Sequence, residues 1–153
     1  QGHPVTFVLI GQGPEKSKLI DKVQSRKQTN VVFLPPVEKK AMPTILRELD
    51  ALYIGLKGDP LFRFGVSPNK LMDYMMSAKP VINAIQAGND IVADSGCGVS
   101  IPPEKPEEIV KAILKLMCLS ETDRVGMGQR GKTYVLANHD YRMLAKQFID
   151  SVG

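Results

Sequence analysis

The residue types that could bind an anionic ligand lie close together near the middle of the chain. Asn69 and Lys70 follow directly on Ser67 and Pro68, and Asp73 comes three residues after the lysine. Serine is a residue type that caps helices through its hydroxyl, and proline suits the first helical position. This order therefore predicts a helix that is capped by Ser67 and begins at Pro68. Unpaired amides and the positive end of the helix dipole would then favour an anion there.

The spacing places Asn69, Lys70 and Asp73 on one side of that helix. A cation and free amides, followed one turn later by a carboxylate, suit a nucleoside diphosphate. The phosphates would meet the helix start, and the carboxylate would accept hydrogen bonds from the ribose hydroxyls. The same pattern also fits an ordinary capped helix with a solvated charge pair, because capped helices are common. From these residues alone both interpretations stay open.

Length and composition exclude several other classes. The chain has 153 residues, 43% of them hydrophobic and 24% charged, which is typical of one globular domain with a core. No apolar run reaches the roughly 20 residues that span a bilayer. The net charge of +4 is mild and is compatible with phosphate-bearing ligands or an anionic membrane surface. We predict no nucleic-acid partner.

Cysteine and histidine usage argues against structural cross-links and metal sites. Cys97 and Cys118 are the only two cysteines, and they fit two thiols in a reducing compartment. His3 and His139 lie far apart in the sequence, which argues against a zinc site. We therefore predict no metal and no cofactor.

Strand and helix patterns alternate along the chain and predict an α/β fold, a Rossmann-like parallel sheet with helices on both faces. β-Branched and apolar runs predict strands at 5–10, 31–34, 50–56, 80–84 and, more briefly, within 95–103. Helical patterns cover 15–25, 38–49 with an interruption at Pro43, the stretch after Ser67, a short turn at 88–92, and segments that begin at Pro106, Ser120 and Tyr141.

The first predicted strand ends in Gly11-Gln12-Gly13-Pro14. A G-x-G alone is a weak signal, because it is neither the dinucleotide-binding fingerprint nor a phosphate loop of the ATPase kind. A strand-to-helix turn that needs glycine for its geometry accounts for it equally well.

The stretch 67–75, followed by 79–82, resembles the donor-site motif of family 4 glycosyltransferases, which have the GT-B fold. It is most similar to the bacterial surface-polysaccharide branch, which carries S-P-N-K-L-F-D-Y-M and then G-K-P-V-I. The wider family has a Glu, seven residues and a second Glu. When the motifs are aligned on Pro80, the second Glu falls on Asp73 and the first on Gly65. The first Glu contacts the donor sugar in the family, and here glycine replaces it.

Two other segments resemble donor-site elements of the same family. Residues 8–15 are similar to its "IVGDGP" turn, which borders the donor pocket and implies a place there for Gly13. The loop after the second strand corresponds to "FLGYV" and implies that Val37 lies near the base. No catalytic residue can be named. The donor-binding residues that the resemblance implies are Gly13, Val37, Gly65, Ser67, Asn69, Lys70 and Asp73.

The resemblance covers nearly the whole chain but only the donor half of such an enzyme. We therefore expect residues 1–153 to form a partial C-terminal nucleotide-sugar-binding domain, with the acceptor domain absent. In the family a further strand, a basic turn and a helix precede the strand at 5–10, and that first strand is central in the order 3-2-1-4-5-6. We expect the chain to lack that strand and helix, so that its sheet closes the gap, swaps with a neighbour or rearranges. We also expect the chain alone not to transfer sugar.

The resemblance implies a retaining glycosyltransferase that uses a nucleotide-diphosphate sugar in bacterial surface polysaccharide synthesis. Its acceptor would be a lipid-linked saccharide held by the missing domain, and the enzyme would be cytoplasmic or peripheral at the inner membrane. Two alternatives remain open. A nucleotide-sugar 2-epimerase shares the fold but needs a histidine near the sugar. The other alternative is a non-catalytic nucleotide-binding or interaction module.

Overall fold

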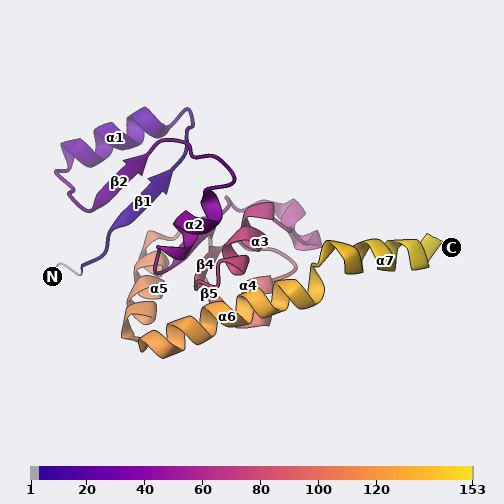
Figure 1. The fold of residues 1–153 in the computed structure, drawn as a ribbon. Helices are drawn as coiled ribbons and strands as arrows, with labels where there is room; N and C mark the ends of the chain where they lie inside the picture. Colours follow the sequence, from indigo (N-terminus) through magenta and orange to yellow (C-terminus); the bar gives the residue numbers. More distant parts are fainter. Residues whose placement is uncertain (1–3, 153) are drawn as a thin grey trace. The chain divides into compact units, whose positions relative to one another are not determined.

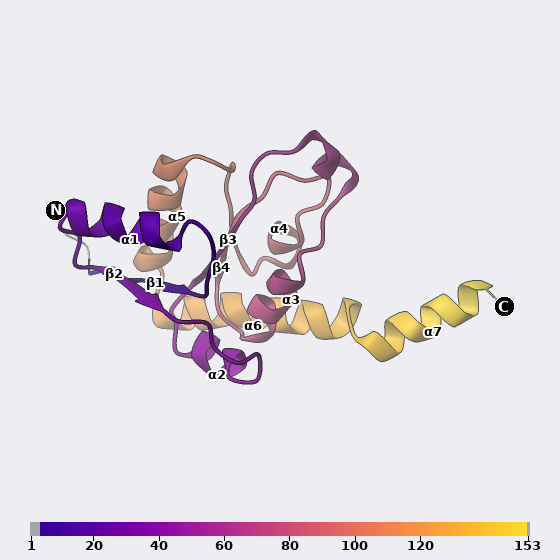
Figure 2. The same ribbon diagram turned by 90° about the horizontal axis from the view of Figure 1, so that it is seen from above.

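The computed structural model describes residues 4–152, which form two compact units that divide between Met42 and Pro43 (Figures 1 and 2). Each unit is built from parallel strands and the helices that connect them. None of the helices in the described part of the chain has both the length and the hydropathy of a membrane-spanning segment.

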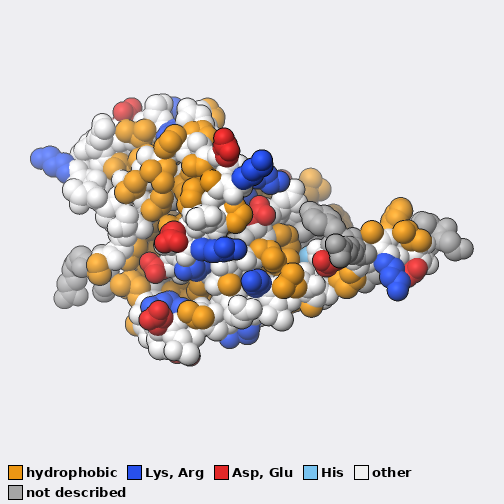
Figure 3. Space-filling model, in the orientation of Figure 1, with side chains coloured by type: hydrophobic (Ala, Val, Ile, Leu, Met, Phe, Trp, Pro, Cys, Tyr) orange, Lys and Arg blue, Asp and Glu red, His pale blue; other side chains and the backbone are white. Residues whose placement is uncertain are grey.

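The first unit is a β-α-β element made of β1 (Phe7–Ile10), α1 (Lys16–Ser25) and β2 (Val31–Leu34). The two strands pair in parallel along their whole length. No residue between 4 and 42 is buried. Figure 3 shows hydrophobic side chains at the surface of this unit, so it has no core of its own. Four of its large apolar residues expose 38–42% of their surface: Phe7, Leu9, Leu19 and Val32.

The second unit is built around a sheet of three parallel strands in the order β3-β4-β5. Its first helix, α2, begins at the last residue of the first unit. The elements are α2 (Met42–Arg47), β3 (Leu52–Gly55), the 3-10 helix η1 (Pro60–Phe64), α3 (Asn69–Met76), β4 (Val81–Ala84), α4 (Ile91–Ser95), β5 (Gly98–Ser100), α5 (Pro106–Cys118), α6 (Glu121–Asn138) and α7 (Tyr141–Val152).

Helices cover both faces of this sheet, and β4 is its central strand. On one face Val81 of β4 packs in a cluster with Met75 of α3 and Val92 of α4, and all three are fully buried. On the other face Ile82 packs with Leu116 of α5. All four residues of β4 are buried, as expected for the middle strand of a parallel sheet that is covered twice. The predicted α/β class is confirmed.

The predicted parallel pairing is confirmed, and the strands are divided between two sheets. The described strands form two separate sheets, β1-β2 and β3-β4-β5. Within each sheet, strands that follow one another in the sequence are hydrogen-bonded neighbours.

Candidate functional site at the start of α3

The start of α3 is open to solvent. Ser67, Asn69, Lys70 and Asp73 are all exposed. Within the described residues, the backbone amides of Asn69 and Lys70 donate to no other group of the chain. Lys70 and Asp73 lie on the same side of the helix by their spacing, and no ion pair joins them in the described part of the chain. The helix start thus offers free donors, a cation and, one turn later, a carboxylate.

The predicted cap by Ser67 is wrong. Pro68, not Ser67, is the residue before the helix, and α3 has no side-chain cap hydrogen bond. Pro68 has φ −68° and ψ 126°, an extended conformation that cannot also be the first helical position. Its carbonyl oxygen accepts from the Leu71 amide at 2.9 Å. The helix therefore begins one residue later than predicted, and its first two amides have no acceptor among residues 4–152.

Asp73 also acts on its neighbour in the helix. Burial raises the pKa of the Tyr74 phenol, and the Asp73 carboxylate raises it further by like-charge repulsion. Tyr74 therefore keeps its phenolic proton at physiological pH. The described residues contain no group of three or more His, Cys, Asp or Glu that could hold a metal ion.

Gly65 follows the end of η1, four residues before the first residue of α3. Its φ of 102° and ψ of 154° lie in a region that side chains with a Cβ rarely adopt. Its amide donates to the Phe62 carbonyl at 2.9 Å. Asp59 caps the beginning of η1 by accepting from the Leu61 amide at 2.8 Å. The segment between β3 and α3 is thus held by hydrogen bonds within itself.

The loop after β4 holds this segment in place, and Figure 2 shows the two running side by side. The Gly88 amide donates to the Phe62 carbonyl at 2.8 Å. The Asn89 side chain accepts from the Val66 amide at 2.8 Å and donates to the Val66 carbonyl at 3.0 Å. No local pattern in the sequence predicts these contacts.

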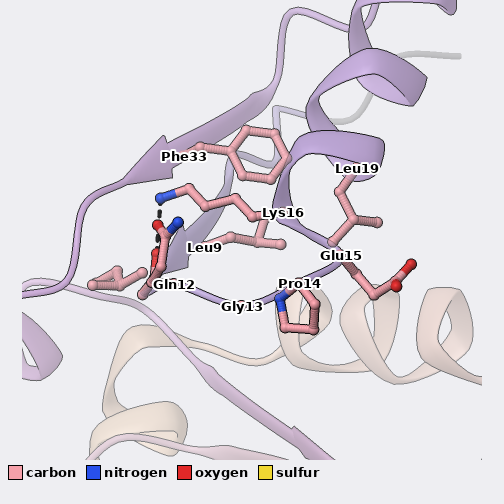
Figure 4. A pocket seen from close by; sticks show the side chains of 10 residues that line it. Leu9, Gln12, Gly13, Pro14, Glu15, Lys16, Leu19 and Phe33 are labelled. Carbon is pink, nitrogen blue, oxygen red and sulfur yellow. Dashed lines mark hydrogen bonds between the residues drawn. The ribbon is translucent and has the colours of Figure 1, made fainter.

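Gly13 and Val37 belong to the first unit, which is described by itself. Gly13 borders a shallow hollow of about 240 Å³ that is lined by Leu9, Leu19 and Phe33 (Figure 4). A Cβ added at Gly13 would meet no atom within 4 Å, so space does not require a glycine there. Val37 lies partly buried in the segment after β2.

Lys16 is a residue of this hollow that sequence reasoning missed. Its ammonium donates to the Gly11 carbonyl at 2.7 Å (Figure 4). It also donates to the Leu34 carbonyl at 2.9 Å. These carbonyls stand at the ends of β1 and β2, so the lysine ties the two strand ends together. Its only signal in the sequence is its place at the first turn of α1, directly after Gly13-Pro14-Glu15.

Comparison with known proteins decides the family. A family model described as "Glycosyl transferases group 1" matches residues 1–118. The chain belongs to this family. Among curated proteins, this group 1 glycosyltransferase chain is similar to the putative colanic acid biosynthesis glycosyl transferase WcaI of Escherichia coli K12. The two are 26% identical over 154 residues, which cover 98% of this chain and 36% of that protein. The chain thus spans about a third of the length of this relative.

Solved glycosyltransferase structures share the fold. Anabaena Alr3699/HepE in complex with UDP-glucose superimposes with a TM-score of 0.74 at 18% identity, covering 97% of this chain and 40% of that one. The C-terminal domain of a glycosyl transferase group 1 family protein (LpcC) from Francisella tularensis gives a TM-score of 0.71 at 22% identity. That match covers 89% of this chain and 70% of that one. These likenesses confirm the GT-B-type fold.

Family membership confirms the resemblance seen in the stretch 67–82 and the glycosyltransferase class. The epimerase alternative finds no support in the match. Of the predicted donor residues of this group 1 glycosyltransferase, Asn69, Lys70 and Asp73 belong to α3, and Gly65 and Ser67 to the segment before it. Their roles toward a ligand remain proposals.

Proposed function

We propose that this chain is the nucleotide-sugar-binding part of a retaining glycosyltransferase that builds bacterial surface polysaccharide. Three findings support the proposal: the family match, the name of the E. coli relative, and the UDP-glucose bound to the Anabaena protein. The observation that carries it is the open start of α3, with free amides at Asn69 and Lys70 and a carboxylate one turn later at Asp73.

The geometry fits a diphosphate better than a single charge. The N-terminal end of a helix carries roughly half a positive charge, and the Lys70 ammonium adds a full one beside it. When the bond from sugar to diphosphate breaks, negative charge grows on the leaving phosphate. Fixed donors at Asn69 and Lys70 would stabilise that charge without rearranging. Asp73 would accept hydrogen bonds from the ribose hydroxyls.

The other predicted residues have more limited support. Gly65 and Ser67 precede the free amides closely in the sequence, and we propose that they border the phosphates and the sugar. Gly13 and Val37 stay predictions that rest on the resemblance. We further propose a lipid-linked saccharide acceptor bound outside the described residues, and action in the cytoplasm at the inner membrane. The free thiols of Cys97 and Cys118 fit such a reducing compartment.

Calorimetric titration of the chain with UDP, GDP, UDP-glucose and inorganic pyrophosphate tests the proposal. Lys70→Ala removes a charge-assisted contact and should weaken all four ligands by roughly 10- to 100-fold. Asp73→Ala should weaken the three nucleotides and leave pyrophosphate unchanged, because pyrophosphate has no ribose. Lys115→Ala and Asp21→Ala serve as controls, since both residues are exposed on other helices.

Two results would contradict the proposal. Affinities that fall equally in the controls and in the Lys70 and Asp73 variants would show a general charge effect. A folded chain that binds neither nucleotides nor pyrophosphate would favour the interaction module instead.

A further inference from the structure

We infer that Asn89 is a positioning residue of this site: it fixes Val66 and thereby presets the start of α3 for a diphosphate. The inference rests on the proposed function. Asn89 lies in the loop between β4 and α4, 23 residues after Val66 in the sequence. Its Oδ1 accepts from the Val66 N–H at 2.8 Å, and its Nδ2 donates to the Val66 carbonyl oxygen at 3.0 Å.

The chemistry of the side chain suits this contact. A primary amide carries an acceptor and a donor in one plane, so it can pair with the N–H and the C=O of a single residue. Aspartate has no donor, and alanine has neither group. Both polar atoms of Asn89 are bonded to Val66, so the side chain is placed to hold the loop.

The loop that carries Asn89 is itself anchored to the sheet. Asp90 accepts from the Ala93 amide at 3.0 Å, which caps α4, and from Nδ2 of Asn83 at 3.2 Å. Asn83 is only 4% exposed and belongs to the central strand β4. A continuous series of contacts therefore leads from β4 through Asp90 and Asn89 to Val66.

Close backbone approach reinforces the same contact. The Gly88 amide bonds to the Phe62 carbonyl, and a Cβ added at Gly88 would lie 2.1 Å from the carbonyl oxygen of Arg63. Only a residue without a side chain lets the two loops meet at this distance. Val66 also packs against the buried cluster that includes α3, so the loop has little freedom once Asn89 holds it.

When Val66 is held in place, the orientation of the helix start that follows it is fixed as well. Only Ser67 and Pro68 separate Val66 from the first free amide, at Asn69. Proline restricts its own φ and the conformation of the residue before it, so the orientation of Val66 is carried to the helix start. The free amides then point in a fixed direction before any ligand binds. Binding to such a preset site loses less conformational freedom.

The test compares Asn89→Ala and Asn89→Asp with Asn138→Ala. Asn138 is the matched control, an exposed asparagine of α6 whose Nδ2 donates to the Tyr134 carbonyl at 2.9 Å. Each purified chain is titrated with UDP and with pyrophosphate, and amide exchange is followed at Val66 and at Met75 of α3. Both Asn89 variants should bind the two ligands about 10-fold more weakly, because ordering the released loop on binding costs about as much as one hydrogen bond contributes. Exchange should quicken at Val66 and not at Met75.

The outcomes separate this inference from the proposed function. If Lys70→Ala weakens binding but both Asn89 variants bind like the wild type, the positioning role is overturned and the proposed function stands. If the wild type binds neither ligand, both fail. Faster exchange at Val66 and Met75 alike would show a general structural role. Loss of UDP but not of pyrophosphate binding would show a direct ligand contact, which also overturns the inference.

Discussion

Helix α6 carries two glycines, two residues apart, whose surroundings differ sharply. A Cβ added at Gly128 would lie 2.0 Å from the carbonyl oxygen of Ala78 and 2.8 Å from the amide nitrogen of Lys79. Both atoms belong to the backbone of the turn between α3 and β4. At Gly126 the nearest atom would be Nη1 of Arg130, at 3.9 Å. Replacing each glycine by alanine should therefore change stability in opposite directions.

The magnitudes follow from these distances. Alanine in place of glycine inside a helix gains about 0.5–1 kcal/mol from lower backbone entropy in the unfolded chain. Gly126→Ala should show that gain. Carbon and oxygen in contact stand about 3.5 Å apart, so Gly128→Ala would have to push α6 about 1.5 Å from Ala78. Overpacking of this kind costs about 1–3 kcal/mol, and a backbone neighbour places the cost at the upper end. The two variants should differ by about 3 kcal/mol.

Urea unfolding followed by circular dichroism measures both variants against the wild type. The midpoint should rise for Gly126→Ala and fall for Gly128→Ala, with similar slopes, because similar surface is exposed on unfolding. Equal gains in both variants would refute the close approach of α6 to the end of α3. The consequence reaches the site, since α6 supports the helix that carries Lys70 and Asp73.

Three further predictions concern thiols, caps and local stability. Cys118 is exposed and should react at once with a thiol reagent. Cys97 should react only on unfolding, because burial shields its thiol and raises the pKa of that thiol. Equal reaction rates of the two thiols in the folded chain would contradict this. Ser120→Ala should lower the free energy of unfolding by about 1 kcal/mol, because Ser120 caps α6. Ser67→Ala should change it by no more than about 0.5 kcal/mol, because Ser67 caps no helix. Equal losses of the two variants in urea unfolding would contradict the cap assignment. Backbone amides of β1 and β2 should exchange with solvent much faster than those of β4, because no residue in 4–42 is buried. Equal protection of the three strands, measured by mass spectrometry, would contradict this prediction.

The sequence predicted those parts of the fold that depend on local pattern. The apolar run at 31–34 became β2 with the same bounds, Pro106 begins α5, and Ser120 caps α6. The predicted cap by Ser67 was wrong because Ser67-Pro68 fits two helix starts that lie one residue apart. In one the proline is the first helical residue, and in the other it is the extended residue before the helix. Local pattern does not choose between them, and the loop contacts do.

The rest of the site depends on contacts between distant residues. Asn89 stands in Gly-Asn-Asp, which predicts a turn and nothing more, and its partner Val66 is 23 residues away. The approach of Gly88 to Arg63 likewise joins segments that no local pattern connects. The contacts of Lys16 also could not be predicted from local pattern, because a lysine in the first turn of a helix is expected to be solvated. Its long stem instead reaches two carbonyls at the strand ends.

Parallel pairing explains why the two loops meet where they do. β3 and β4 are neighbours, and their last residues, Gly55 and Ala84, stand level in the register. Both chains therefore leave the sheet at the same edge, the carboxyl end, where open α/β sheets bind their ligands. The loop after β3 leads to the free amides of α3, and the loop after β4 supplies Asn89 to hold it. Because one residue of slip would turn every side chain of a strand to the other face, the buried residues of β4 that fix this register also fix the site.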